Sequence, residues 1–166
     1  MINNLKIVLI RFLAFILVLS NFSCEDISSY DIIIVGGGTS GVVSAIQSSR
    51  MGSKTLLIEE SNWLGGMITS AGVSAMDGNY KMPSGFLKEF RDSLVSHYGN
   101  LDSLKTGWVS NLMFEPSVGN KILKEIAQSE KNLKILYGTI IEEVVKDEKF
   151  KIKINQNDIT YNSTIL

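Results

Sequence analysis

Residues 31–60 read DIIIVGGGTSGVVSAIQSSRMGSKTLLIEE, and this stretch decides the fold. A short apolar run at 31–35 is followed by apolar residues with helical spacing at 39–51 and by a second apolar run at 54–58. A strand, a helix and a second strand in this order form a βαβ unit, in which the two strands lie parallel in one sheet. The stretch therefore predicts an α/β fold built on a parallel sheet.

A glycine-rich turn joins the first predicted strand to the helix. Gly36, Gly38 and Gly41 have the spacing GxGxxG, directly after a strand and at the start of a helix. In this setting the first glycine permits a tight turn, the second lets the backbone approach a pyrophosphate, and the third brings the helix close to the sheet. The free N–H groups at Thr39 and Ser40, together with the positive end of the helix dipole, favour a phosphate. Glycine-rich loops also occur for turn geometry alone, so the prediction of nucleotide binding depends on the sequence around the turn.

An acidic residue ends the second predicted strand. Glu59 stands at the distance from Gly36 that completes a dinucleotide-binding fingerprint. Its carboxylate can accept hydrogen bonds from both hydroxyls of an adenosine ribose, and it would repel a 2′-phosphate. We interpret the next residue, Glu60, as a solvated neighbour. Proteins that bind NAD and proteins that bind FAD both use this unit, so the pattern through Glu59 leaves both cofactors open.

A second glycine pair, Gly65-Gly66, follows the acid and precedes Met67. With this pair, residues 31–67 resemble the first motif of FAD-dependent oxidoreductases of the glutathione-reductase structural class. The resemblance implies a Rossmann-like FAD-binding domain with FAD as cofactor, and it places Gly65, Gly66 and Met67 beside the pyrophosphate and the ribityl side of the flavin. It also implies that the segment ending at Ile141 reads the adenine edge with its backbone, which makes Ile141 a candidate contact.

The middle of the chain predicts an insertion and a second αβ step. Residues 67–113 are expected to form a loop and helix insertion, in which Ser84 caps a helix that ends at Gly99. Pro116 suits the first turn of a further helix, and residues 133–137 are expected to form the strand after it.

The last part of the chain predicts three short strands joined by polar turns, an antiparallel three-stranded β-meander. The strands are expected at 140–146, 150–154 and 159–161. A new apolar run at 163–166 predicts the beginning of another strand. We therefore expect residues 30–166 to be the N-terminal portion of the FAD-binding domain, C-terminally incomplete.

Several kinds of flavin chemistry require side chains that this sequence lacks. Cys24 is the only cysteine, which excludes a redox-active cysteine pair and iron–sulfur ligation by cysteines within the mature part of the chain. We interpret the single histidine, His97, as a surface or capping residue. Because it lies far from the Gly-Gly pair, where fumarate-reductase-like relatives carry histidyl-FAD linkages, we expect FAD to be bound non-covalently. No metal site and no catalytic residue is predicted.

Composition and charge argue against nucleic acid as a partner. The 166 residues carry a formal net charge of -1, and no Lys/Arg cluster is interleaved with aromatic residues. A chain of this length, with 45% hydrophobic residues, is expected to form one domain with its own core.

Residues 1–24 have the layout of a secretory signal peptide. Lys6 and Arg11 precede an apolar run at 12–19, and mainly small or polar residues follow it up to Cys24. The run is shorter than the roughly 20 residues of a membrane span, so a permanent transmembrane helix is the less favoured interpretation. The pattern resembles a bacterial lipoprotein signal, in which Cys24 becomes the lipidated first residue; cleavage and release of the chain is the alternative. We expect the protein to be exported to the bacterial periplasm or cell envelope.

Together these patterns predict an exported FAD-dependent oxidoreductase that transfers a hydride or an electron pair. The sequence identifies neither the small-molecule substrate nor the electron acceptor. A non-catalytic, membrane-tethered FAD-binding module or an inactive fragment is one alternative. An NAD-dependent dehydrogenase is another, although it leaves Gly65-Gly66 unexplained. We also expect residues 1–166 alone to lack turnover, because the part that covers the flavin would be missing.

Overall fold

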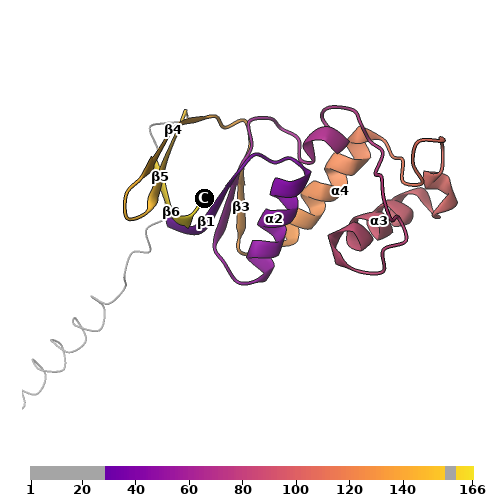
Figure 1. Cartoon of the computed structure of the whole chain (residues 1–166), viewed down its shortest axis with the longest axis horizontal. Coiled ribbons are helices and arrows are strands. Elements are labelled where there is room, and N and C mark those ends of the chain that lie inside the picture. Colours follow the sequence, from indigo (N-terminus) through magenta and orange to yellow (C-terminus); the bar gives the residue numbers. More distant parts are fainter. Residues whose placement is uncertain (1–28, 156–159) are drawn as a thin grey trace, which may run out of the picture.

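The computed structural model describes residues 29–155 and 160–166, which form one six-stranded sheet with helices packed against it (Figure 1). The strand order is β3-β2-β1-β6-β5-β4. The strands are β1 (Ser29–Val35), β2 (Thr55–Ile58), β3 (Leu133–Leu136), β4 (Ile141–Lys146), β5 (Phe150–Ile154) and β6 (Thr160–Ile165). The helices are α2 (Thr39–Arg50), α3 (Gly85–Tyr98) and α4 (Pro116–Ser129), with the 3-10 turns η1 (Gly66–Ile68) and η2 (Asp102–Leu104).

The predicted βαβ unit is present and starts the sheet. β1 pairs with β2 in parallel and β2 pairs with β3 in parallel. All four residues of β2 are buried, as expected for a parallel strand whose two faces are both covered. The α/β fold with a parallel sheet is therefore confirmed, and so is Pro116 as the first residue of α4.

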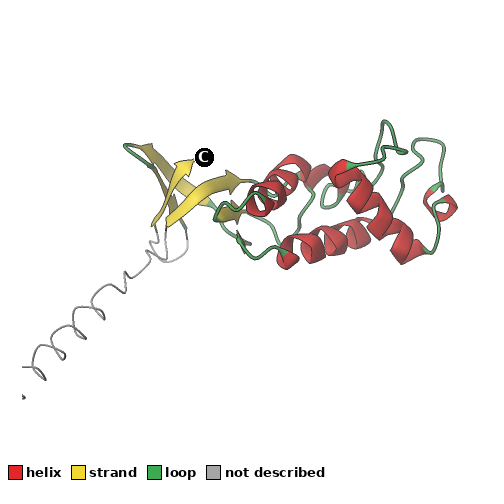
Figure 2. Cartoon of the chain, turned by 90° about the horizontal axis from the view of Figure 1, so that it is seen from below, coloured by secondary structure: helices red, strands yellow, loops and turns green. Residues whose placement is uncertain are grey.

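The two faces of the parallel strands are covered by different layers. Figure 1 shows the meander strands and the helices on opposite sides of β1, and Figure 2 shows the helices gathered at one end of the molecule. Because side chains alternate along a strand, Leu57 faces the helices, where it joins one hydrophobic core with Ile46 of α2 and Leu123 of α4. Leu56 faces the other way and joins a second core with Ile152 of β5. The helices and the β-meander thus bury the parallel strands between them.

The meander prediction requires one correction. Residues 159–161 and 163–166 were expected to belong to two strands, but the described part of this segment is the single strand β6, and residue 159 lies outside the described residues. Tyr161 and Ser163 are both buried on one side of this strand. Asn162 between them only continues the alternation, so a polar residue there does not interrupt the strand. β6 pairs with β5 in antiparallel and with β1 in parallel, so one strand serves both the meander and the parallel sheet.

Residues 66–113, which include the predicted insertion, form η1, α3 and η2 connected by long loops. Helix α3 packs on the α4 side of the molecule, where the Phe90 ring meets the Phe114 ring edge-on at 5.4 Å between centroids. Gly99 ends the helix with a φ of 90°, as expected, whereas Ser84 occupies the N-cap position without a side-chain capping hydrogen bond. The sequence thus predicts the N-cap position correctly, but the Ser84 side chain does not cap the helix.

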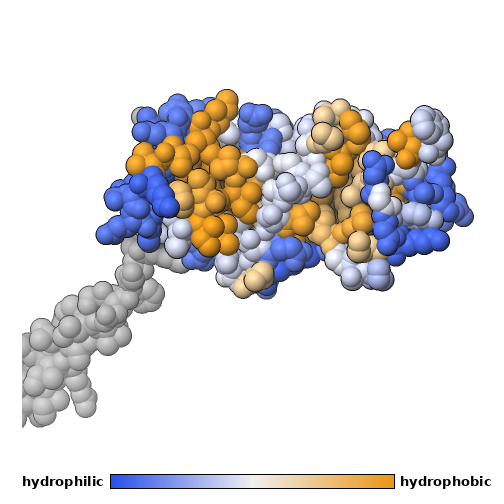
Figure 3. Space-filling view, viewed as in Figure 1, coloured by the Kyte–Doolittle hydropathy of each residue, from blue (hydrophilic) through white to orange (hydrophobic). Residues whose placement is uncertain are grey.

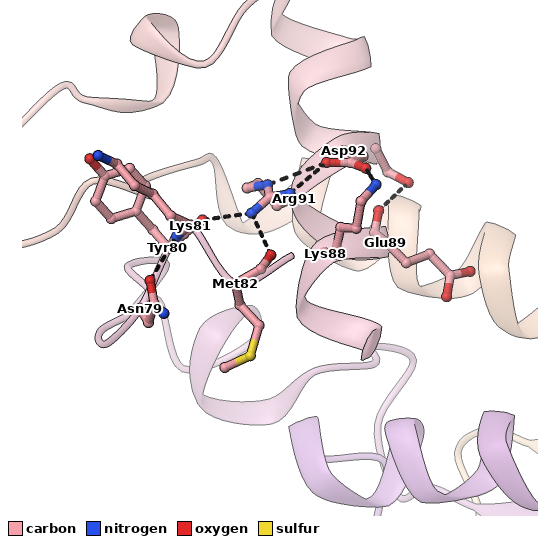
Figure 4. Close-up of polar contacts among 9 residues, drawn as sticks. Asn79, Tyr80, Lys81, Met82, Lys88, Glu89, Arg91 and Asp92 are labelled. Carbon is pink, nitrogen blue, oxygen red and sulfur yellow. Dashed lines mark hydrogen bonds and ion pairs between the residues drawn. The ribbon is translucent and has the colours of Figure 1, made fainter. Parts of the chain in front are cut away.

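Arg91 of α3 holds the loop that precedes the helix. Its Nη1 donates to the backbone oxygens of Tyr80 and Met82 at 2.8 and 2.9 Å, and its guanidinium also contacts Asp92 (Figure 4). On the other side of α3, Glu89 forms an ion pair with Arg50 at the end of α2. These contacts fix the insertion to the βαβ unit and to its own loop.

No helix within residues 29–155 and 160–166 has the length and hydropathy needed to cross a membrane. The predicted signal peptide, residues 1–24, lies outside the described residues.

Candidate functional site

The turn after β1 needs glycine at two positions for backbone reasons. Gly36 has a φ of 92°, and its N–H donates to the carbonyl of Ile58 at 2.8 Å. A Cβ added at Gly41 would lie 2.0 Å from the carbonyl oxygen of Gly36 but 3.6 Å from the nearest side-chain atom of β1, which is an ordinary contact. The third glycine was expected to let the helix approach the sheet. In the structure it lets the helix approach the turn itself.

Gly38 leaves an open space instead. It is the N-cap of α2, with φ -61° and ψ 174°, a conformation that any residue can adopt. A Cβ at this position would meet no protein atom within 4 Å. The N–H groups of the first helical turn have no partner within the helix. The surface above Gly38 is therefore a cradle that a side chain would fill, next to donors suited to an anion.

The two glycine segments, residues 36–41 and 65–66, lie against each other although they are far apart in the sequence. The Gly65 N–H donates to the Gly37 carbonyl at 2.8 Å, and the Thr39 hydroxyl donates to the Gly65 carbonyl at 2.8 Å. Gly65 has a φ of 107°, and a Cβ on Gly66 would come within 3.0 Å of the Cα of Gly38. Glycine is thus required at both positions of the second pair, and the register of this pair behind Glu59 has a structural cause.

Glu59 connects the end of β2 to the glycine turn. Its carboxylate is buried and accepts the Gly37 N–H at 2.5 Å on Oε2 and the Ser61 N–H at 2.8 Å on Oε1. Each carboxylate oxygen can accept a further hydrogen bond. A Cβ on Gly37 would lie 2.9 Å from Oε2, which accounts for a fourth glycine within residues 36–41. The sequence predicts the position of Glu59 but not its hydrogen bond to the glycine turn.

A cavity of about 260 Å³ opens beside Glu59 at the carboxyl ends of β1 and β2. Open α/β sheets bind ligands at this edge. Ile141 lies in its wall, while the N–H and the carbonyl of Ile140 are already bonded to Asn155. Ile141 therefore stays a candidate contact, and the backbone of Ile140 is committed to the protein. The lining residues are Val35, Gly36, Ile58, Glu59, Glu60, Thr139, Ile140 and Ile141.

Tyr137, just after β3, is a residue that the sequence prediction did not select as part of the site. Its phenol oxygen is buried, and it has no hydrogen-bond partner in the described structure. Burial raises the pKa of Tyr137, and the negative charge of Glu59 raises it further, so the phenol stays protonated. The ammonium of Lys124 lies 4.8 Å from the centre of its ring. A tyrosine after a strand has no spacing signature, so only the fold could reveal it.

The remaining candidate site residues and the single histidine are exposed on the surface. Ser40 lies exposed in the first turn of α2, and the Met67 side chain is 68% exposed in η1. His97 is exposed at the end of α3, away from the glycine turn, as expected for a surface residue. Within the described residues, no group of three or more His, Cys, Asp or Glu side chains is placed to hold a metal ion.

Local sequence similarity connects the chain to known flavoenzymes. A stretch of 43 residues is 42% identical to dihydrolipoyl dehydrogenase of Trypanosoma brucei brucei, and it covers 26% of this chain and 9% of that protein. A stretch of 51 residues is 39% identical to mitochondrial dihydrolipoyl dehydrogenase 1 of Arabidopsis thaliana, covering 31% of this chain and 10% of that protein. The matches thus span about a tenth of these relatives.

Solved structures share the fold at low sequence identity. The p-nitrophenol 4-monooxygenase of Pseudomonas putida aligns with a TM-score of 0.52 and 11% identity, over 84% of this chain and 40% of that one. Cyclohexanone monooxygenase in its closed form aligns with a TM-score of 0.53 and 11% identity, over 82% of this chain and 25% of that one. At this identity the likeness concerns the fold alone.

The family match is broader, because it covers residues 31–165. The matched family is described as FAD dependent oxidoreductase. FAD fits the residues present, since the open space above Gly38 suits a pyrophosphate and the cavity beside Glu59 suits an adenosine. The chain belongs to the family of FAD-dependent oxidoreductases, and its cofactor is FAD.

Proposed function

We propose that this chain holds the ADP half of FAD at the carboxyl edge of β1 and β2, in an enzyme that transfers a hydride or an electron pair. The observation that carries the proposal is the contact between the two glycine segments, beside which a Cβ on Gly38 would meet no protein atom within 4 Å. A turn shaped only for chain reversal would not need an empty position at the start of a helix.

Each predicted residue has a distinct task in this proposal. The N–H groups at Thr39, Ser40 and Gly41 bind the pyrophosphate, because they have no partner within the helix. The free lone pairs of Glu59 accept the ribose hydroxyls, while its other contacts keep the carboxylate in place. Ile141 contacts the adenine from the wall of the cavity.

The second glycine pair directs the other half of the cofactor. Gly65 and Gly66 bring backbone up to Gly38, so the ribityl side of FAD passes over them toward Met67. Bound FAD supplies a carrier of two electrons, and the surrounding chain supplies binding, orientation and exclusion of side reactions. The glycine segments provide the orientation, since the turn and the start of α2 are hydrogen-bonded to each other and to Gly65.

The substrate and the acceptor are not specified by this chain. Its structural neighbours carry out different reactions, as their names show, and this chain spans 25–40% of the two monooxygenases compared. The proposal is therefore limited to flavin-mediated transfer by the whole protein. A non-catalytic FAD-binding module remains the competing hypothesis, whereas no observation favours an NAD-dependent dehydrogenase.

The proposed reaction can be tested with the FAD-loaded whole protein. Under anaerobic conditions the bound flavin is mixed with NADH, NADPH, amino acids and alcohols, and its bleaching is followed; the reduced protein is then mixed with oxygen or a quinone. We expect at least one donor and one acceptor to exchange electrons with bound FAD at least a hundredfold faster than with free FAD. Exchange no faster than that of free FAD with the whole panel would favour the non-catalytic module.

We further propose that the protein is exported and that a lipid on Cys24 holds it at the membrane. The proposal is supported by the charged start, the short apolar run and the position of the cysteine. A lipid on Cys24 would insert its acyl chains into the bilayer and hold the mature chain at the membrane surface.

A further inference from the structure

Three lysines from separate parts of the sequence lie together at the amino-terminal edge of the parallel strands. Lys54 precedes β2, Lys131 precedes β3, and Lys134 lies within β3. With Tyr30 and Asn132 they line a hollow of about 430 Å³. We call Lys54, Lys131 and Lys134 the basic edge.

Lys131 and Lys134 supply the exposed positive charge of the basic edge. Lys131 and Lys134 are exposed, and within the described part of the chain neither forms an ion pair. The Lys54 ammonium lies 5.4 Å from the centre of the Tyr30 ring.

The acidic groups on this side of the molecule have other partners. Asp31 accepts the Lys54 backbone N–H at 2.8 Å, and Glu130 is bonded to Arg50 at 2.7 Å. Within the described residues, neither Asp31 nor Glu130 forms an ion pair with Lys131 or Lys134.

The basic edge lies at the opposite end of the strands from the cofactor site. Tyr30 lines the hollow and Val35 lines the cavity beside Glu59, five residues further along β1, which corresponds to about 17 Å. The chain also enters the fold at the basic edge, because Ser29 begins β1. Cys24 precedes Ser29 by five residues, a reach of at most about 18 Å.

From this arrangement we infer that the basic edge faces anionic phospholipid headgroups of the membrane that holds Cys24. The short tether keeps this edge near the lipid surface, where each lysine strengthens binding about fivefold. The cofactor edge then points away from the membrane, toward soluble partners. The inference rests on the proposed anchor at Cys24 and not on the redox reaction. Glu25 and Asp26 lie in the tether and weaken the attraction, so the contribution of the lysines has to be measured in chains that keep both acids.

The first experiment measures which lysines the membrane covers. Protein extracted from membranes is reconstituted on the outside of vesicles of phosphatidylcholine, with or without 30% phosphatidylglycerol, and treated with an amine-reactive label. We expect labelling of Lys131 and Lys134 to fall at least fivefold on the anionic vesicles, with Lys121 on α4 as an unchanged internal control. Equal labelling of Lys131 and Lys134 on both kinds of vesicle would overturn the inference. Protection by 10 mM inorganic phosphate without vesicles would overturn it too, since the edge would then be a site for a soluble anion.

The second experiment measures binding with matched variants. Lys131→Gln with Lys134→Gln removes two charges at the basic edge, and Lys88→Gln with Lys121→Gln removes two charges from α3 and α4. On anionic vesicles at 0.1 M salt, the basic-edge pair should bind about 25-fold more weakly than the parent, and the helix pair should bind as the parent does. Binding of the basic-edge pair at parental strength would contradict the inference. The mass of Cys24 is determined separately, so absence of the lipid is distinguished from failure of the basic edge.

Discussion

Gly38 and Gly41 belong to one turn, yet the fold itself requires glycine only at Gly41. At Gly41 an added methyl group would overlap the carbonyl of Gly36, which is backbone and cannot move away cheaply. At Gly38 the methyl group would stand in open space. The sequence motif gives both positions the same letter, and only the three-dimensional turn separates a glycine needed for folding from a glycine needed for the ligand.

We therefore expect alanine at these two positions to change the stability of the cofactor-free chain by different amounts. Gly41→Ala should lower the free energy of unfolding by about 3 kcal/mol, because the overlap forces the turn and the helix apart. Gly38→Ala should leave it within about 0.5 kcal/mol of the parent. Urea unfolding without FAD measures both. Equal destabilisation by the two substitutions would show that the geometry of the turn is misjudged.

We expect substitution of Glu59 to lower the stability of the chain as well as its affinity for FAD. In Glu59→Gln the side-chain amide keeps only one acceptor atom, so either the Gly37 or the Ser61 N–H faces a donor. An unsatisfied buried N–H costs about 1–3 kcal/mol, measurable as a lower unfolding temperature without FAD. Glu60→Gln is the matched control, because Glu60 is exposed. Full stability of Glu59→Gln would mean that these hydrogen bonds do not form.

At the scale of elements, the βαβ unit was predictable because each of its parts has a local signature. Apolar runs, helical spacing and glycine positions sufficed for β1, α2 and β2. The sequence did not reveal that β6 joins the β-meander to the parallel strands, because that depends on which strand lies beside β1 in space. The same limit applies to Tyr137, which approaches Glu59 only because β3 lies beside β2.

The attachment of α3 to α2 predicts a dependence of stability on pH. The hydrogen bonds and the charge of Arg50 hold the pKa of Glu89 below its ordinary value of 4.5. Its stabilising effect is therefore present above pH 4.5 and is lost as the pH falls through the lower pKa of the folded state. The expected size is about 0.5–1 kcal/mol, reduced by the partial exposure of both side chains.

Arg50→Met tests this expectation. The variant should lose this contribution at pH 7 and match the parent near pH 2, as measured by urea unfolding across the pH range. Lys121→Met removes the exposed pair between Lys121 and Glu125 and should change little at either pH. A parent and an Arg50→Met variant with the same pH profile would show that the ion pair contributes nothing.

At the scale of the whole molecule, the proposed export predicts where the protein is found in the cell. Cells that make the chain should carry it in the envelope fraction with residues 1–23 removed, and Cys24→Ala should move it away from the membrane. Fractionation and the mass of the mature protein measure both effects. Protein in the cytoplasm that keeps Met1 would contradict the proposal.

Cofactor binding is the property on which the whole account depends. FAD affinity of the parent and of Gly38→Ala, measured by fluorescence titration alongside Glu60→Gln, tests it most directly. The account predicts one FAD bound per chain in the parent and in Glu60→Gln, and at least a tenfold loss of affinity in Gly38→Ala at unchanged stability, because the added methyl group occupies the pyrophosphate space. Equal affinity of Gly38→Ala and the parent would contradict the assignment of the site.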